Sequence, residues 1–294
     1  MNEYVYAILF GIIVGTIARL LMLKTDYRQY PTYLHGKIIH LALGFIAASL
    51  GAVAVPALLE QEYTAVTFLT IAASQFREVR NMERETLTGM DSYELVSRGN
   101  TYIEGIAIAF ESRNYLVIFT SLFSTLSFIV WNIYVGIAVA IICYLLIRKY
   151  MSGSSLGKIV DIEHSDITFD GAGLYVDNIY IMNIGLKERQ EEILKYGMGF
   201  VLKPKTFDAR SSIANLGQRQ AILHDISVSL GVFRDSGTPA LVPLIKRDLD
   251  DGRIGVFILP QDKDVQKAIN VIQSVPVLEN AVRMPSESKV MNKG

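Results

Sequence analysis

Long apolar runs occupy the first half of the chain, and short alternating patterns occupy the second half. A membrane-spanning helix needs about 20 largely apolar residues. The pattern predicts an α-helical multi-pass membrane domain over residues 1–150, with five spans at about residues 4–23, 38–59, 64–80, 114–131 and 132–149. The last two come from one run that is too long for a single crossing, so we predict a turn at Trp131-Asn132.

A shorter apolar stretch, residues 101–112, precedes the fourth span and contains Glu104 and Gly105. Its apolar part is too short to cross a bilayer. We therefore expect this stretch to lie along the interface or to enter the membrane and return, with Gly105 permitting a bend or a close helix contact. A carboxylate in this setting needs water or a basic partner, and Arg98 and Arg113 are the candidate partners of Glu104.

Basic residues set the expected orientation. They occur between the first and second spans, between the third and fourth, and after the fifth, while the other loops carry glutamate and no lysine or arginine. The positive-inside rule then places the N-terminus outside and the C-terminal half in the cytoplasm. Arg19 and His40 lie near cytoplasmic span ends, so we expect Arg19 to snorkel and His40 to face interfacial water.

Small residues recur at four-residue spacing in the first two spans, which lets helix backbones approach closely in lipid. The residues at these positions include Gly11, Gly15, Gly44, Ala48 and Gly51. Two interpretations are open. These faces pack within one bundle, or they join two copies of the chain in a homo-oligomer.

The second half predicts a soluble α+β domain over residues 158–284, after a Gly/Ser linker at 151–157 and before a disordered tail at 285–294. Strands are expected at 158–169 and 174–184, and a helix at 186–196. From residue 199 the expected order is βαββαβ, as in ferredoxin-like folds. Its elements are predicted at 199–203, 214–232, 240–246, 253–259, 263–274 and 277–283.

Composition narrows the chemistry. The chain is 51% hydrophobic and 19% charged with a net charge of -1, which gives no argument for nucleic-acid binding. Its single cysteine, Cys143, lies in an apolar run, and its four histidines lack metal-ligand spacing, so no metal or cofactor is expected. His224 and Asp225 are neighbours on a predicted helix, where their side chains point about 100° apart.

One triplet suggests catalysis. Asp235-Ser-Gly matches the aspartic-protease triplet, in which two aspartates share a proton across a dimer. Arg234 before it, Pro239 after it and the helical flanking pattern are typical instead of a turn between a helix and a strand. Asp235 is therefore the one candidate catalytic residue, weighed against ordinary turn chemistry.

The apolar stretch opens with a six-residue signature, YIEGIA. Its residues are Tyr102, Ile103, Glu104, Gly105, Ile106 and Ala107. By this motif, and by length and architecture along the whole chain, the sequence resembles the YIEGIA family of integral membrane proteins of endospore-forming Firmicutes. The resemblance implies a link to sporulation, a place in the cell membrane or a spore membrane, and a small cytosolic protein partner. It implies no catalytic residues.

Three functions follow as hypotheses. The first is a sporulation-associated membrane protein whose cytoplasmic domain is an assembly or partner-binding scaffold. The second is a membrane-anchored protease that uses Asp235. The third is transport of a small solute or ion, although the chain lacks the internal repeat expected of a transporter.

Overall fold

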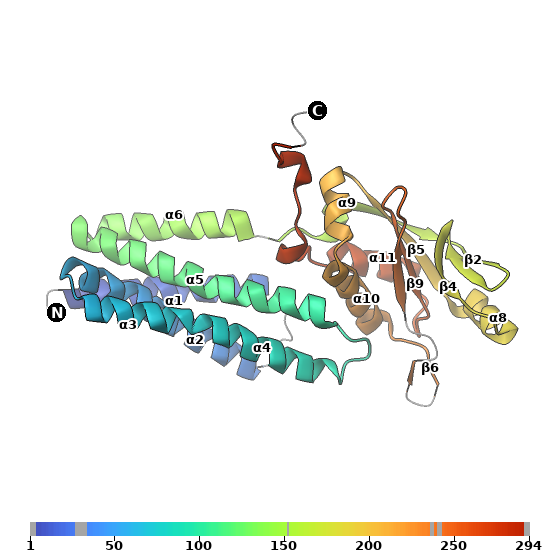
Figure 1. Ribbon diagram of the computed structural model, residues 1–294, viewed down its shortest axis with the longest axis horizontal. Helices are drawn as coiled ribbons and strands as arrows, with labels where there is room; N and C mark the ends of the chain where they lie inside the picture. The colour runs from blue at the N-terminus through green and yellow to red at the C-terminus, as the bar shows by residue number, and fades with distance from the viewer. Residues whose placement is uncertain (1–3, 27–33, 152, 236–237, 240–242, 291–294) are drawn as a thin grey trace. The chain divides into compact units, whose positions relative to one another are not determined.

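The structure, a computed structural model, describes the chain except for residues 1–3, 27–33, 152, 236–237, 240–242 and 291–294 (Figure 1). The chain divides into two compact units. Unit 1 comprises Met1–Glu85 and Ile106–Gly153, and unit 2 comprises Thr86–Gly105 and Ser154–Gly294. The predicted division into a helical first half and an α+β second half is confirmed. Residues 86–105, however, belong with the second half and not with the membrane domain assigned to 1–150.

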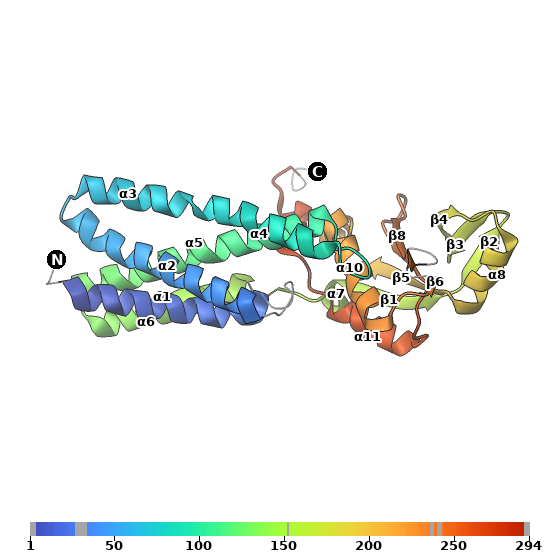
Figure 2. The ribbon, with the colours of Figure 1, turned by 90° about the horizontal axis from the view of Figure 1, so that it is seen from below.

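Unit 1 is built from helices that run side by side in both views (Figures 1 and 2). Two of them, α4 and α5, also extend into unit 2. The helices are α1 (Val5–Asp26), α2 (Leu34–Leu59), α3 (Tyr63–Ser74), α4 (Phe76–Asp91), α5 (Asn100–Val130) and α6 (Ile133–Met151). The turn predicted at Trp131-Asn132 is where α5 ends and α6 begins, and the Asn132 side chain caps α6 by accepting a hydrogen bond from the Val135 N–H at 3.0 Å.

Among the described residues, three helical segments are long and apolar enough to cross a membrane: Val5–Leu23, Gly36–Leu59 and Asn100–Val130. The predicted span at 64–80 is not one apolar helix. α3 has 12 residues, which measure about 18 Å, and after Gln75 the chain continues as the polar helix α4. The outer face of α1 is apolar, because Leu9, Ile13 and Ile17 lie one turn apart and are all exposed.

The interfacial stretch and the fourth predicted span form one helix. α5 runs without interruption over 31 residues, about 46 Å, so two of the predicted alternatives, the bend at Gly105 and the re-entrant segment, are wrong. That residues 101–112 lie along the interface stays a prediction. Residues 101–107 have no helix breaker except one glycine, which a helix tolerates at a cost of about 1 kcal/mol. A core about 30 Å thick accommodates only about 20 of these residues, so part of α5 must lie outside it.

Unit 2 contains two main antiparallel sheets. The four-stranded sheet has the order β1 (Val160–Ser165), β5 (Met198–Pro204), β9 (Ile254–Ile258), β8 (Leu244–Arg247). The three-stranded sheet has the order β2 (Ile167–Asp170), β3 (Gly173–Val176), β4 (Ile179–Asn183). The single strand predicted at 174–184 is thus two strands, because Asp177 adopts a positive φ of 56° and turns the chain between them.

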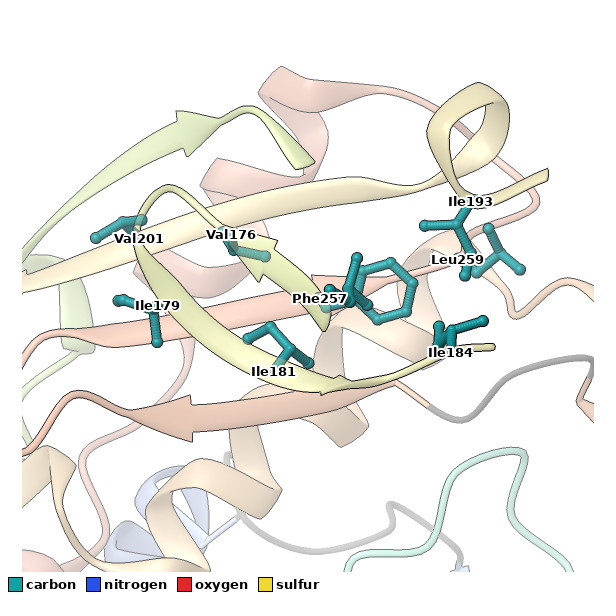
Figure 3. Packing of buried hydrophobic residues seen from close by; sticks show 9 residues of the cluster. Val176, Ile179, Ile181, Ile184, Ile193, Val201, Phe257 and Leu259 are labelled. Atoms are coloured by element: carbon teal, nitrogen blue, oxygen red, sulfur yellow. The ribbon is translucent and has the colours of Figure 1, made fainter. Parts of the chain in front are cut away.

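The two sheets share an apolar core, seen in Figure 3. Strands β3 and β4 contribute Val176, Ile179 and Ile181, and the four-stranded sheet contributes Val201 and Phe257. These positions come from period-2 alternation, which puts every second side chain of a strand on one face. α8 (Lys187–Tyr196), which was predicted almost to the residue, adds Ile193 to the core and ends at Gly197.

The remaining helices of unit 2 begin at recognisable caps. The predicted helix at 214–232 is α10 (Leu216–Leu230), where the Asn215 side chain accepts from the Gln218 N–H. A helix that the pattern did not predict, α9 (Phe207–Ile213), precedes it and is capped by Thr206. α11 (Val265–Ser274) is capped by Asp264. Short helical turns complete the unit: α7 (Leu156–Ile159), η2 (Glu279–Ala281) and η3 (Pro285–Glu287).

The last strand of the predicted βαββαβ order is absent. Residues 277–283 contain the η2 turn, and β1 occupies the sheet edge beside β5. The Gln218 side chain explains the difference. Its amide donates to the Pro276 carbonyl at 3.0 Å and accepts from the Leu278 N–H at 2.8 Å, so these backbone groups are not free for a strand ladder. The elements β5, α10, β8, β9 and α11 occur in the predicted sequence along the chain, with α9 and two short strands added between them. Residues 240–242 of the strand predicted at 240–246 lie outside the described residues.

The linker and tail are more ordered than expected. Within the predicted linker, Leu156 is buried and its N–H donates to the Val275 carbonyl at 2.9 Å. Within the predicted disordered tail, η3 is tied to α9 because the Ser286 N–H and hydroxyl both donate to the Asp208 carboxylate. Residues 291–294 of the tail lie outside the described residues.

Candidate functional site

The signature occupies the first two turns of α5. Tyr102, Ile103, Ile106 and Ala107 are buried, with Tyr102 only 2% exposed, whereas Glu104 is half-buried. Residues at positions i, i+3 and i+4 lie on one helix face. The apolar residues of the signature therefore form a face that packs against other parts of the protein. The boundary between the two units falls inside the signature, between Gly105 and Ile106.

The start of α5 packs closely on α10 and η2 within unit 2. A Cβ atom on Gly105 would lie 2.7 Å from both terminal atoms of the Asn280 amide in η2. A Cβ atom on Gly217, in the first turn of α10, would lie 3.0 Å from the Thr101 carbonyl oxygen. The glycine of the signature is therefore explained by this contact with Asn280 and not by a bend.

The segment before α5 is held by Asp91 at the end of α4. The Arg98 N–H donates to Asp91 Oδ1 at 2.6 Å, and the Gly99 N–H donates to Asp91 Oδ2 at 3.0 Å. Arg98 is buried and forms ion pairs with Glu94 at 2.9 Å and with Asp91 at 3.9 Å. Gly99 has a φ of 75°, which glycine adopts without strain. One carboxylate thus fixes the turn that leads into the signature.

Two residues of α10 complete this arrangement. His224 is buried, and its Nδ1 lies 2.7 Å from the Val96 carbonyl oxygen. Asp225 interacts electrostatically with both Tyr102 and Arg98. We name Asp91, Arg98, Tyr102, His224 and Asp225 the signature cluster, and all five lie in unit 2.

The two α10 residues of the signature cluster have shifted pKa values. Burial raises the pKa of Asp225 to about 6, with the nearby charge of Arg98 acting in the opposite direction. Burial also lowers the pKa of His224 below its ordinary value, against the hydrogen bond with Val96. The cluster can therefore hold or release a proton near neutral pH. Sequence reasoning missed it, because neighbouring His and Asp on a helix gave no sign that His224 faces the segment before α5 and that Asp225 lies near Tyr102.

Two basic residues were predicted as partners of Glu104, namely Arg98 and Arg113. The ion pairs of Arg98 are made with Glu94 and Asp91. Arg113 follows Glu104 by nine residues of continuous helix, which places them about 13.5 Å apart along the axis and on opposite faces. A pairing of Glu104 with Arg98 stays a prediction.

The first residue of the aspartic-protease triplet, Asp235, lies in a two-residue strand. Asp235 is in β6 (Arg234–Asp235), which pairs with β7 (Thr238–Pro239) so that Asp235 is opposite Thr238. Ser236 and Gly237, and the Asp235 side chain, lie outside what the structure describes. Asp235 as a catalytic residue stays a prediction.

Arg19 does not snorkel; it lies fully buried in unit 1. Its Nη2 is 2.9 Å from His40 Nδ1, and its guanidinium carbon is 5.6 Å from the centre of the Phe110 ring. His40 is also buried, and its ring packs against the Phe110 ring in a T-shaped arrangement, with 4.5 Å between the ring centroids. A Cβ atom on Gly44 would lie 2.3 Å from Arg19 Cγ, so this glycine makes room for the arginine. Ionisable residues within apolar bundles are costly unless partnered, and His40 and Phe110 partner Arg19.

The small residues at four-residue spacing pack within the bundle. A Cβ atom on Gly15 would lie 2.7 Å from Ala48 Cβ, and one on Gly11 would lie 1.9 Å from Thr125 Oγ1. Ser121 of α5 donates to the Ala48 carbonyl at 2.7 Å. These faces are therefore occupied by α1, α2 and α5 themselves. The Ser121 hydroxyl thus bonds to a neighbouring helix, whereas the Thr120 and Ser124 hydroxyls donate to carbonyl groups within α5 itself.

Among the residues that the structure describes, no group of three or more His, Cys, Asp or Glu side chains could hold a metal ion. The signature cluster also places the cation of Arg98 beside its carboxylates. Its side chains are thus a buried polar group that can bind a proton.

Replacing Asp91 with alanine should release the turn into the signature. Two backbone N–H groups would lose a charged acceptor, and Arg98 would lose a partner, so we expect unfolding to require about 2 to 4 kcal/mol less free energy. Faster hydrogen exchange at the Arg98 and Gly99 amides would locate the effect. Asp262→Ala removes an exposed carboxylate that pairs, among the described residues, only with Lys267, and it should cost under about 1 kcal/mol. Equal effects of the two substitutions would contradict the role of Asp91.

Comparison with known proteins gives one family and one near relative. The family described as "YIEGIA protein" matches residues 7–288. A Bacillus subtilis (strain 168) protein, with the printed name "Uncharacterized protein YphB", is 64% identical over 287 residues, which cover 98% of this chain and 97% of that protein. No solved structure matches the chain.

Proposed function

This chain belongs to the YIEGIA protein family, and we propose that it is a membrane-anchored scaffold of sporulating cells. In this proposal, unit 1 anchors the chain in the cell membrane or a spore membrane. Unit 2 lies in the cytoplasm and binds a small cytosolic protein. Membrane lipid and a second copy of the chain are further proposed partners.

One observation carries the proposal. The first residues of the signature pack on α10 and η2 of unit 2, and the same unbroken helix then continues into the apolar bundle. A helix shared in this way is suited to holding a soluble domain on a membrane anchor. The signature cluster has an arginine paired with carboxylates, and we assign it this structural role.

We further propose that α3 and α6 enter the membrane beside the three apolar helices, with the N-terminus outside. α3 has no buried residue, and its Phe68 is 69% exposed, which suits contact with lipid. Arg148 and Lys149 at the end of α6 favour a cytoplasmic position for that end.

The sheet of unit 2 supports a ferredoxin-like assignment in a rearranged form. β1 takes the edge position beside β5 that the final strand would fill in the usual order. The sheet then ends at β1 on one side and β8 on the other. Sheet edges present backbone groups that can pair with another chain, so they are natural places for assembly.

The proposal can be tested in Bacillus subtilis, because the relative there is 64% identical. A strain lacking that relative should form fewer heat-resistant spores, and this chain should restore them. Gly105→Leu should fail to restore them although the protein still reaches the membrane. The added side chain would overlap the Asn280 amide, and such overpacking costs about 1 to 3 kcal/mol or more.

Matched variants separate the three hypotheses. Gly89 lies in the same unit, at a position where an added Cβ atom has no neighbour within 4 Å, so the Gly89→Leu variant should restore sporulation.

The Asp235→Ala variant tests the protease hypothesis. Full activity at normal protein levels would exclude a protease that uses Asp235, and loss of activity would favour that protease. Solute or ion flux in liposomes that Glu104→Gln abolishes would favour transport. Normal sporulation of the deletion strain would overturn the proposed role.

A further inference from the structure

Two arginines meet at the edge of the four-stranded sheet. Arg219 lies in the first turns of α10, and Arg247 is the last residue of the edge strand β8. Leu244 packs into the core between the sheets, so alternation places Arg247 on the opposite face of β8. Burial, and then the nearby charge of Arg247, lowers the pKa of Arg219. Helix α10 is in contact with strand β8, so the two guanidinium groups are neighbours.

These two cations have no counter-ion among the described residues. The Nε atom of each is shielded from solvent and makes no hydrogen bond there. Other arginines of unit 2 behave differently: Arg189 pairs with Glu192 at 2.6 Å, and Arg253 pairs with Asp177 at 2.8 Å. Half-buried like charges without a partner oppose folding. A bound anion would remove that cost.

We propose that Arg219 and Arg247 form a binding site for a phosphate group. Guanidinium groups present planar donor forks that match phosphate oxygens. A dianionic phosphate neutralises both arginines, whereas a single carboxylate neutralises one. The phosphate group has two sources, a soluble phosphate compound or the headgroup of an anionic phospholipid.

The site is tested by titrating inorganic phosphate into the full chain, held in nanodiscs of neutral lipid at low salt, with calorimetric detection. We expect saturable binding that sodium chloride at equal ionic strength does not reproduce. Arg219→Gln and Arg247→Gln should each weaken it by on the order of tenfold. Arg219→Lys keeps the charge but loses the fork, so it should also weaken binding.

Controls keep the result decisive. Arg189→Gln removes an exposed, paired arginine and should bind phosphate as the wild-type chain does. Neither glutamine variant should lower the unfolding temperature without phosphate, because each relieves repulsion. Competition from phosphatidic acid in the nanodisc would assign the site to a lipid headgroup, and its absence would assign it to soluble phosphate. Wild-type binding that chloride matches, or that survives both glutamine substitutions together, would overturn the site.

Discussion

Replacing Gly51 with alanine is expected to separate α2 from α5 and to destabilise unit 1 by about 1 to 3 kcal/mol or more. The new Cβ atom would lie 2.2 Å from the Ile118 carbonyl oxygen and 3.0 Å from its carbon. Both are backbone atoms of α5, so no side-chain rotation can relieve the overlap. Moving the helices apart would also stretch the hydrogen bond from Ser121 to the Ala48 carbonyl. Overpacking of this kind costs about 1 to 3 kcal/mol, and occasionally more.

The matched control is Gly89→Ala in α4. An added Cβ there meets nothing within 4 Å, and alanine favours a helix over glycine by about 0.5 to 1 kcal/mol. We therefore expect Gly89→Ala to leave stability unchanged or to raise it. Unfolding of the full chain in mixed micelles, followed by circular dichroism, compares the two variants. Equal stability of Gly51→Ala and Gly89→Ala would disprove the α2–α5 contact.

The sequence patterns located many elements of unit 2 because those elements have strong local signals. The helix predicted at 186–196 corresponds to α8, the strand predicted at 199–203 to β5, and the helix predicted at 263–274 to α11. The prediction of a final strand at 277–283 was wrong for a non-local reason. Its alternation fits a strand, but a side chain 58 residues earlier, Gln218, binds the Pro276 carbonyl. The sequence near residue 276 does not predict that hydrogen bond.

The signature was misjudged for a different reason. Ile103 and Ile106 raise hydropathy in the same way whether lipid or protein surrounds them. The prediction placed Ile103 and Ile106 at or in the membrane, whereas the structure buries both side chains within the protein. Gly105 likewise fits a bend or a close contact equally well from its letter alone. Only the position of Asn280, far along the chain, decides for the contact.

Arg19 shows the same limit within the bundle. Its place near a span end favoured snorkelling, because a long side chain can reach water from there. The structure instead surrounds it with His40 and Phe110, which come from two other helices. Gly44 was assigned to helix packing from its spacing, and it does pack closely, but against the arginine side chain and not against another small residue.

Asp225→Asn is expected to stabilise the chain at neutral pH and to remove the fall in its stability with rising pH. The pKa of Asp225 is about 6 in the folded chain, against 3.8 for an ordinary aspartate. Between these values the folded chain holds a proton that the unfolded chain has released. The stabilisation of the folded state from this group is therefore complete below pH 3.8 and is lost as the pH rises through 6. Each pKa unit corresponds to about 1.4 kcal/mol, so the whole change is about 3 kcal/mol.

The charged and titrating groups near Asp225 also affect the pH dependence of stability. Arg98 opposes the shift, Tyr102 is neutral across the window, and His224 has a pKa lowered by burial. Asparagine has the shape of a protonated aspartate and carries no charge, so the variant should lose the fall in stability with rising pH. The lowered pKa of His224 should then leave a rise in stability between pH 4 and pH 7. The measurement is chemical denaturation of the full chain across this range, where His224→Gln removes the second titrating group.

Asp166→Asn is the control, because Asp166 is exposed between β1 and β2. It should retain the pH dependence of the wild-type chain. A wild-type stability that does not fall between pH 4 and pH 7 would show that Asp225 is ionised without cost. The same fall in Asp225→Asn would assign the proton to another group. A fall in the wild-type chain that only Asp225→Asn removes would place a titrating carboxylate beneath the signature, where each ionisation weakens the hold of α10 on the first turns of α5.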